Sequence, residues 1–287
     1  MLQGLLTRPT PVTTSRDREA QHFLHLLDET DEVEHSLAVK TLRIRLLGDF
    51  ALLASDTQVT SLDVPRLQSL LAYLALHRGV PQARSRIAYT LWPDSTDAQA
   101  HTNLRNLLFK LRMILPEVDP FLVVERQTLG FRPDVLWSLD VMEFEDAIAR
   151  AEQAHGRQDE AAERLALEEA VQLYQGDLLP SCYDEWICGE RDRLQQVYQG
   201  ALERLIGLLE QAGNYAGAIR VAQRLVRLDP LQEATYRHLM RLYAARGDRG
   251  ALARTYRTCT AVLQRELAVQ PALTTRKTYE QLMRAED

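Results

Sequence analysis

The stretch that decides the fold runs from Asp94 to Arg132 and reads DSTDAQAHTNLRNLLFKLRMILPEVDPFLVVERQTLGFR. Pro116 divides it, because a proline ends a helix. After Pro116, two short strands are predicted from Phe121 to Glu125 and from Gly130 to Arg132. Before it, leucines recur at spacings of three and four, which predicts a helix with one face on a core: Leu104, Leu107, Leu108, Leu111 and Leu115.

Polar side chains lie beside the leucine stripe and at the tip of the hairpin. Their types are those that reach DNA phosphates and base edges. They are Thr102, Asn103, Arg105, Asn106, Lys110 and Arg112 on the helix, and Arg126, Gln127 and Thr128 at the hairpin tip. A helix that can enter a groove, followed by a hairpin with a basic tip, is the layout of a winged helix-turn-helix. An ordinary surface helix and hairpin would explain these residues equally well.

The residues before this stretch favour the winged domain. Apolar and arginine side chains alternate from Leu42 to Leu46, which predicts a strand, and further strands are predicted at 50–53 and 58–64. Pro65 begins a helix that Gly79 ends, and 83–91 form a second, short helix. Three strands, three helices and a hairpin, in that order, are the winged helix-turn-helix arrangement.

Three arginines lie near the starts of the predicted helices. Arg66, Arg84 and Arg86 are candidates for contacts to backbone phosphates, since helix N-termini favour anions. For each arginine taken alone, a solvated surface side chain is an equally good interpretation.

After Trp137 the chain is predicted to be almost entirely helical, and it contains an internal repeat. Four residues recur 34 positions later, with Leu202, Leu205, Ile206 and Leu209 becoming Tyr236, Leu239, Met240 and Tyr243. Gly213 recurs as Gly247 at the same spacing. Thirty-four residues is the period of tetratricopeptide repeats, which stack and present a concave groove for peptides or helices. A purely structural scaffold is the alternative.

The predicted fold is therefore mainly α with a small β component. Residues 1–40 form an N-terminal extension, partly disordered or a short helix. A winged helix-turn-helix DNA-binding domain spans 41–137, and an all-helical tetratricopeptide-like domain spans 138–287. Within the extension, His22 and His25 are one helical turn apart, but no third ligand is nearby, so no metal site is expected.

The charge distribution matches this division. The net charge is −6, yet residues 41–137 hold eleven basic and nine acidic residues, and only this segment is positive. An acidic remainder does not prevent DNA binding when basic residues share a face, although it predicts modest, salt-sensitive affinity for a single chain.

Other functional classes find little support in the sequence. There is no glycine-rich phosphate loop and no nucleophile elbow, so an enzyme is not expected, and no cofactor is implied. Three cysteines without metal spacing suggest a reducing, cytoplasmic setting. No apolar run approaches the roughly 18 residues of a membrane span.

Nine segments in order make residues 42–286 resemble one known family. The chain is similar to the bacterial transcriptional activators related to antibiotic regulatory proteins, which join an OmpR-type winged helix-turn-helix to an all-helical bacterial transcriptional activator domain. The matching segments are LRIRLLGDF, RLQSLLAYLALHRGVP, RSRIAYTLWPD, NLRNLLFKLRMIL, TLGFRPD, EAVQLYQGDLLP, WICGERDRL, LVRLDPLQEATYRHLMRLYAARGD and YRTCTAVLQRELAVQP.

The resemblance implies a transcription factor. Such proteins bind direct repeats in double-stranded promoter DNA, as a homodimer or higher assembly, and recruit RNA polymerase holoenzyme. The bound protein would be associated with the nucleoid. Many relatives carry further domains after the activator domain, so the resemblance implies either a short family member or the front of a longer protein.

The resemblance also assigns roles to residues. Thr102, Asn103, Asn106 and Lys110 would face the major groove, Arg105 and Arg112 would reach bases or phosphates, and Arg126, Gln127 and Thr128 would form the wing tip. Leu107, Phe109 and Met113 depart from the family pattern, because related helices carry polar or basic residues there. This thin basic content motivates an alternative function, a helical-repeat interaction module whose degenerate winged helix docks protein. A salt titration of DNA binding separates the two.

Overall fold

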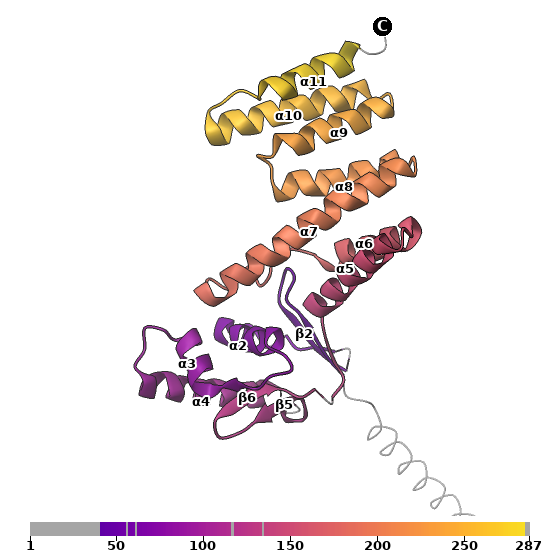
Figure 1. Ribbon diagram of the computed structural model, residues 1–287. Helices are drawn as coiled ribbons and strands as arrows, with labels where there is room; N and C mark the ends of the chain where they lie inside the picture. The colour runs from indigo at the N-terminus through magenta and orange to yellow at the C-terminus, as the bar shows by residue number, and fades with distance from the viewer. Residues whose placement is uncertain (1–40, 56, 61, 116–117, 134, 285–287) are drawn as a thin grey trace, which may run out of the picture. The chain divides into compact units, whose positions relative to one another are not determined.

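A computed structural model describes residues 41–55, 57–60, 62–115, 118–133 and 135–284 (Figure 1). Within them, every strand precedes a long all-helical part. The prediction of a mainly α fold, with a winged helix-turn-helix followed by tetratricopeptide-like helices, is confirmed. The predictions made for residues 1–40, including the pair His22 and His25, lie outside the described residues.

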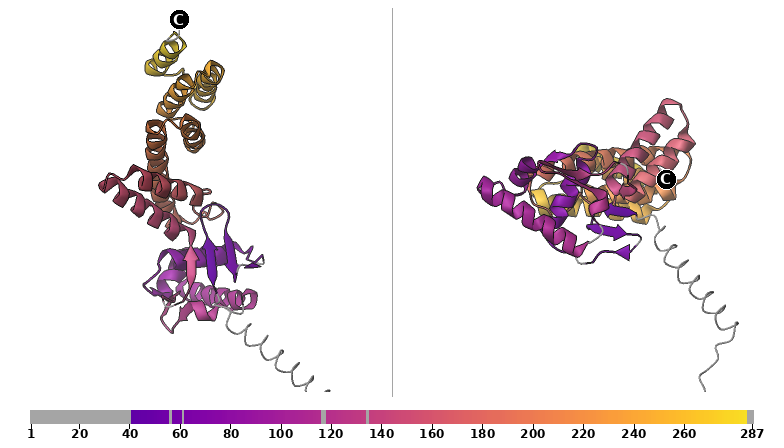
Figure 2. Two further views of the ribbon diagram at one scale, coloured as in Figure 1. Left: turned by 90° about the vertical axis from the view of Figure 1, so that its right-hand side faces the viewer. Right: turned by 90° about the horizontal axis from the view of Figure 1, so that it is seen from below.

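The first sheet is built around the predicted alternating strand. Its order is β3-β2-β1-β7, formed by Thr57–Gln58, Ala51–Ala54, Leu42–Arg45 and Trp137–Leu139. Alternation buries Leu42 and Ile44 and exposes the arginines between and after them. The left view of Figure 2 shows β7, in pink, alongside the indigo strands. The strand predicted over 58–64 is wrong in extent, since only Thr57 and Gln58 pair with β2.

Three helices follow, and a second sheet closes the domain. The helices are α2 (Pro65–Leu76), α3 (Arg84–Leu91) and α4 (Asp97–Ile114), and the sheet order is β4-β6-β5, formed by Gln82–Ala83, Thr128–Phe131 and Leu122–Val124. The hairpin predicted after Pro116 is present with shifted strands. Phe121 lies in a 3-10 turn, η1 (Asp119–Phe121), and not in the first strand. The leucine stripe of α4 packs into the core as predicted.

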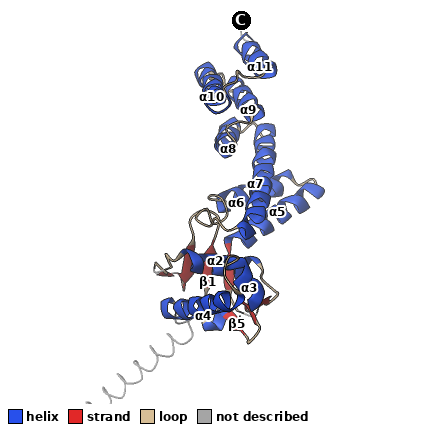
Figure 3. Cartoon of the chain, turned by 90° about the vertical axis from the view of Figure 1, so that its left-hand side faces the viewer, coloured by secondary structure: helices blue, strands red, loops and turns tan. Residues whose placement is uncertain are grey.

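The helical domain contains seven helices in the described residues and no strand among them, and its helices are drawn in blue in Figure 3. They are α5 (Asp140–Gly156), α6 (Glu160–Leu173), α7 (Glu185–Gln211), α8 (Tyr215–Leu228), α9 (Glu233–Ala245), α10 (Arg249–Leu267) and α11 (Leu273–Arg284). Each packs against the next in the chain.

The 34-residue repeat has a structural counterpart at the helix starts. Gly213 and Gly247 both adopt a φ of +69°, which a glycine accommodates without strain. The following residues, Asn214 and Asp248, cap α8 and α10 by accepting hydrogen bonds from the amides of Gly217 and Ala251 at 2.9 and 2.8 Å. The two copies therefore share a glycine turn and a capping side chain.

Strand β7 crosses the expected domain boundary between residues 137 and 138. It pairs in parallel with β1, and the next residue, Asp140, begins α5. The buried Asp140 carboxylate accepts hydrogen bonds from the amides of Leu46 and Leu47 at 2.8–2.9 Å. Burial raises the pKa of Asp140, although these amides oppose the shift. The sheet thus runs into the helical domain without a linker.

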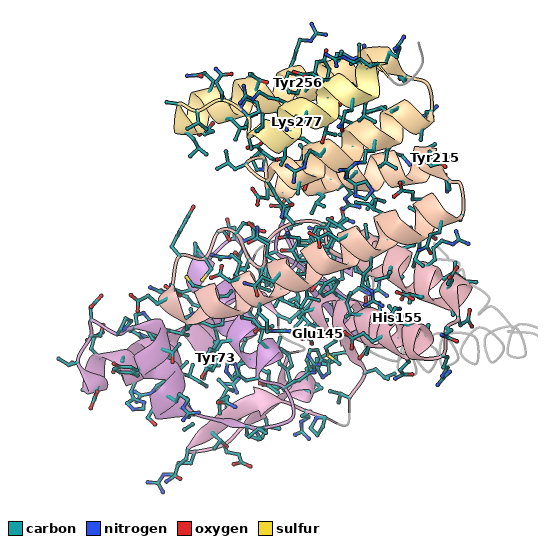
Figure 4. All side chains as sticks on the ribbon, turned by 45° about the horizontal axis from the view of Figure 1, so that its top comes forward. Tyr73, Glu145, His155, Tyr215, Tyr256 and Lys277 are labelled. Carbon is teal, nitrogen blue, oxygen red and sulfur yellow. The ribbon has the colours of Figure 1, made fainter. Side chains whose placement is uncertain are left out.

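Helix α7 makes a second junction with the winged domain. At its start, Asp184 accepts hydrogen bonds from Arg66 at 2.6 Å and Ser69 at 2.9 Å, both on α2. Tyr73 of α2 packs edge-on against Trp186, with ring centroids 5.3 Å apart. Figure 4 labels Tyr73 of α2 and Glu145 of α5, and Glu145 pairs with Arg193 of α7. Helix α2 is therefore held against α7 by charge and by aromatic packing.

Candidate nucleic-acid interface

The outer face of α4 is mixed, with polar and apolar side chains. Asn106 and Lys110 are exposed, and on the same helix Phe109 and Met113 expose 65% and 68% of their surface. Leu107, by contrast, is buried in the core. Only Phe109 and Met113 therefore make this helix surface less polar than the resemblance leads one to expect.

Two polar residues of α4 are half-buried and hydrogen-bonded within the helix. The Thr102 hydroxyl donates to the carbonyl oxygen of Ala98 at 2.9 Å. The Asn103 side-chain oxygen accepts from the Gln99 amide group at 2.8 Å. The second bond is exposed and can be exchanged for a contact to a base edge, since amide groups both donate and accept.

A cleft of about 520 Å³ collects residues from three separate segments. It is lined by Ala83, Arg84 and Ser85 at the start of α3, His101 and Arg105 on α4, and Arg126 and Gln127 at the hairpin tip. The sequence predicted four of these seven residues and missed Ala83, Ser85 and His101. The spacing of His101 and Arg105 was the available signal, because residues four apart on a helix share a face.

The hairpin tip is fastened to the start of α3. The Arg84 amide donates to the Gln127 carbonyl oxygen at 2.8 Å, and the Arg84 guanidinium donates to the Glu125 carbonyl oxygen at 3.2 Å. Within the tip, the Thr128 hydroxyl donates to the Glu125 carboxylate at 2.7 Å. These bonds fix the position of Arg126 and Gln127 relative to Arg105, while Arg84 keeps its charge at the cleft.

Two of the arginines proposed from sequence have carboxylate partners. Arg112 pairs with Asp119 at 2.9 Å, so its charge is partly neutralised at the end of α4. Arg66 pairs with Asp184 at the α2–α7 junction and does not line the cleft. Burial alone would raise the pKa of Asp184, but hydrogen bonds from Ser69 and Arg66 outweigh it and lower the pKa. Arg86 is exposed, with no ion pair to any described residue.

The cleft and the α4 face together offer mainly hydrogen-bond donors and positive charge. Arginine forks match phosphate oxygens and base edges. No group of histidine, cysteine and carboxylate side chains suited to a metal ion occurs in the part of the chain that the structure describes. The arrangement can bind an extended anion.

Comparison with known proteins identifies a matching domain family and similar regulatory proteins. The Bacterial transcriptional activator domain matches residues 139–283. The regulatory protein AfsR of Streptomyces griseus and that of Streptomyces coelicolor are each 25% identical to the chain over 232 residues, which is 80% of this chain. The chain spans only 23% of the length of either relative.

A solved structure shares the fold. Mycobacterium tuberculosis EmbR, in complex with a low-affinity phosphopeptide, superposes with a TM-score of 0.64 at 20% identity. The match covers 86% of this chain and 66% of that one. The family that matches the helical domain is thus described as one of bacterial transcriptional activators. The chain belongs to the bacterial transcriptional activator domain family. In the described residues, none of the helices has the length and apolarity to cross a membrane.

Proposed function

We propose that the chain binds double-stranded promoter DNA through its winged domain and activates transcription by recruiting RNA polymerase holoenzyme, without a cofactor or catalytic step. The cleft carries this proposal, since it brings Arg84, Arg105 and Arg126 together from three segments. Two or more chains would lie side by side on direct repeats, as the family resemblance implies.

In this proposal each part of the surface contacts a different part of the duplex. Helix α4 enters the major groove, where Asn106 and Lys110 reach base edges and Phe109 contacts thymine methyl groups. Thr102 and Asn103 lie at the edge of this contact. The remaining residues hold phosphates or the adjacent minor groove: Arg84, Arg86, Arg105, Arg112, Arg126, Gln127 and Thr128.

Fluorescence anisotropy tests this arrangement with a duplex selected by the full chain from a random library. Arg105→Ala with Arg126→Ala is expected to weaken binding by about tenfold or more and to reduce the log–log salt slope by roughly two, one per lost phosphate contact. Arg43→Ala with Arg45→Ala is the matched control, since both arginines are exposed on β1. Equal losses in the two variants would contradict the proposed interface.

Recruitment requires its own measurement. RNA polymerase holoenzyme added to the chain on its selected duplex is expected to form a slower-migrating complex in a gel. On the same duplex without the chain, holoenzyme binding is expected to be weaker. If the chain left holoenzyme binding unchanged, the DNA-binding proposal would stand and recruitment would not.

One observation favours a second candidate, docking of a protein by the winged domain. Tyr89, Phe109 and Met113 each expose 65% to 70% of their surface on α3 and α4, and aromatic and methionine side chains are enriched at protein interfaces. This alternative predicts no salt-dependent duplex binding, whereas phosphate contacts impose a steep negative slope.

A further inference from the structure

The helical domain contains a groove that lies outside the candidate DNA interface. A hollow of about 640 Å³ is formed between α6, α7 and α8. Aliphatic side chains contribute to its lining, namely Val171, Leu205, Leu209 and Val221. A second hollow of about 400 Å³, between α8, α9 and α10, shares Gln223 and Arg227 with the first. The two form one track that crosses α8.

Arginines form a stripe along this track. Arg220, Arg224 and Arg227, with Gln223, follow the spacing of three and four that places residues on one face of a helix. Helix α8 contains no acidic residue, and Arg254 adds a fourth arginine from α10. The single carboxylate that lines the track is Glu168, which already pairs with Arg164.

These arginines differ from most of those on the three helices before them, where only Arg191 donates to backbone carbonyl oxygens and to no carboxylate of the described residues. Arg150, Arg164, Arg193 and Arg204, on α5, α6 and α7, all have carboxylate partners. Arg220 and Arg227 are exposed and form no ion pair within the described part of the chain. Arg224 only donates to the Tyr174 carbonyl oxygen at 3.3 Å and lies 5.9 Å from the Tyr198 ring centroid.

The arginine stripe therefore lowers the stability of the chain when nothing is bound to it. Like charges three and four residues apart on a helix repel one another and destabilise it. The surrounding residues 138–287 hold nineteen basic and twenty-four acidic residues, so carboxylates are abundant in this domain and yet are not used here. A ligand that brings negative charge would relieve the repulsion.

We propose that this groove binds an acidic peptide segment of a partner protein, with apolar side chains on its aliphatic floor and carboxylates on Arg220, Arg224 and Arg227. The larger hollow has an aliphatic floor, which suits leucine-like side chains. Single-stranded nucleic acids stack on aromatic rings, and the tyrosines of the track, Tyr236 and Tyr243, line only the smaller hollow. One arginine guanidinium can donate two parallel hydrogen bonds to one carboxylate. This pairing fixes the orientation of the bound carboxylate as well as attracting it. The proposal does not depend on DNA binding by the winged domain.

The test uses the full chain and a short fluorescein-labelled peptide in which glutamate and aspartate alternate with leucine. Arg220→Glu with Arg227→Glu is expected to weaken peptide binding by about tenfold or more, equivalent to one decade in Kd. Arg241→Glu with Arg276→Glu is the matched control, since both arginines are exposed and neither lines the track. The control is expected to bind the peptide as the unaltered chain does.

Three further readouts make the result decisive. Helical circular dichroism and binding to the selected duplex report whether each variant is folded, and both are expected to be unchanged. A peptide with lysine in place of the acidic residues is expected not to bind. Peptide affinity unaffected by the groove variant, an equal loss in the control, or equal binding of the lysine peptide would overturn the proposal. So would a groove that bound single-stranded DNA or a second copy of the chain, but not the acidic peptide.

Discussion

Phe109 lies in the middle of the exposed face of α4, with 65% of its surface accessible. An aromatic ring there contributes nothing to phosphate attraction, but it distinguishes a thymine methyl group from a bare base edge. Under the proposed function, this ring would allow a helix with few basic residues to discriminate between DNA sequences. The proposed function therefore assigns DNA affinity mainly to the cleft and sequence preference to the centre of α4.

Replacing this ring by a positive charge separates the two contributions. Phe109→Lys is expected to tighten binding to unrelated duplexes by roughly threefold to tenfold and to steepen the salt slope by about one, because one phosphate contact is gained. Discrimination for the selected duplex should fall. Leu165→Lys, at a position 61% exposed on α6, is the control and should leave both quantities unchanged in the same anisotropy titrations.

Asp184 is expected to make stability depend on pH. Its pKa is lowered in the folded chain, so the stabilisation it provides is present above its ordinary value of 3.8 and is lost as pH falls through the lower, folded value. At neutral pH, Asp184→Asn is expected to reduce the free energy of unfolding by on the order of 2 kcal/mol, since Arg66 loses its counter-ion. The deficit should shrink below about pH 4.

Urea unfolding between pH 3 and pH 7 measures this effect. Asp192→Asn, an exposed position on α7, provides the comparison and should follow the unaltered chain at every pH. A deficit for Asp184→Asn that stayed constant across this range would show that the carboxylate charge is not its cause.

The partners of individual arginines are what the sequence could not reveal. Arg66 pairs with a carboxylate 118 residues later in the chain, which no local pattern can indicate. Arg112 pairs with Asp119 only because η1 turns the chain back beside the end of α4. The types of residue at the cleft were predictable from spacing, whereas the neutralisation of particular charges required the fold.

At the scale of elements, a close backbone approach joins the β1–β2 turn to the segment before α7. A Cβ placed on Gly176 would lie 3.1 Å from the Gly48 Cα, and Gly48 itself has a φ of +97°. The Gly48 amide donates to the Asp177 carbonyl oxygen at 3.0 Å. Both glycines are therefore required for the two chain segments to hydrogen-bond.

Gly176→Ala is expected to lower the free energy of unfolding by about 1–2 kcal/mol, because the added methyl group pushes against backbone that cannot rotate away. Gly207→Ala is the opposite case. It lies inside α7, with nothing within 4 Å of its Cβ position, and should stabilise the chain by roughly 0.5–1 kcal/mol. Thermal or urea unfolding of both variants measures the signs, and a stabilised Gly176→Ala would contradict the close approach.

The helices were predictable because each repeats an apolar position every three to four residues over several turns. Strands β4 and β7 were not, since they contain two and three residues and pair with distant segments. Trp137 has no sequence feature that identifies Leu42 as its partner. The boundary expected after residue 137 therefore fell inside a strand.

For the whole molecule, this strand makes the winged domain depend on the residues after it. A fragment 41–137 lacks most of β7 and the Asp140 carboxylate. Strand β1 would therefore lose its neighbouring strand, and the amides of Leu46 and Leu47 would lose their hydrogen-bond acceptor. It is expected to unfold without a cooperative transition. A fragment 41–228 keeps these contacts and should unfold cooperatively in circular dichroism.

Amide hydrogen exchange provides a sharper check within the full chain. Asp140→Ala is expected to accelerate exchange at Leu46 and Leu47 by about tenfold or more, since buried amides are left without acceptors. Exchange in α10 should be unaffected. If fragment 41–137 unfolded as cooperatively as fragment 41–228, the dependence of the winged domain on β7 would be disproved.

The direct passage from β7 into α5 has a geometric consequence on DNA. If α4 enters the major groove as proposed, the direct connection would fix the direction in which each α8 groove faces around the duplex. Under the proposed function, about five extra base pairs between two repeats, roughly half a turn, would place the grooves on opposite faces, and about ten would realign them. The spacing of the repeats would then determine whether one partner protein can bind the grooves of two neighbouring chains at the same time.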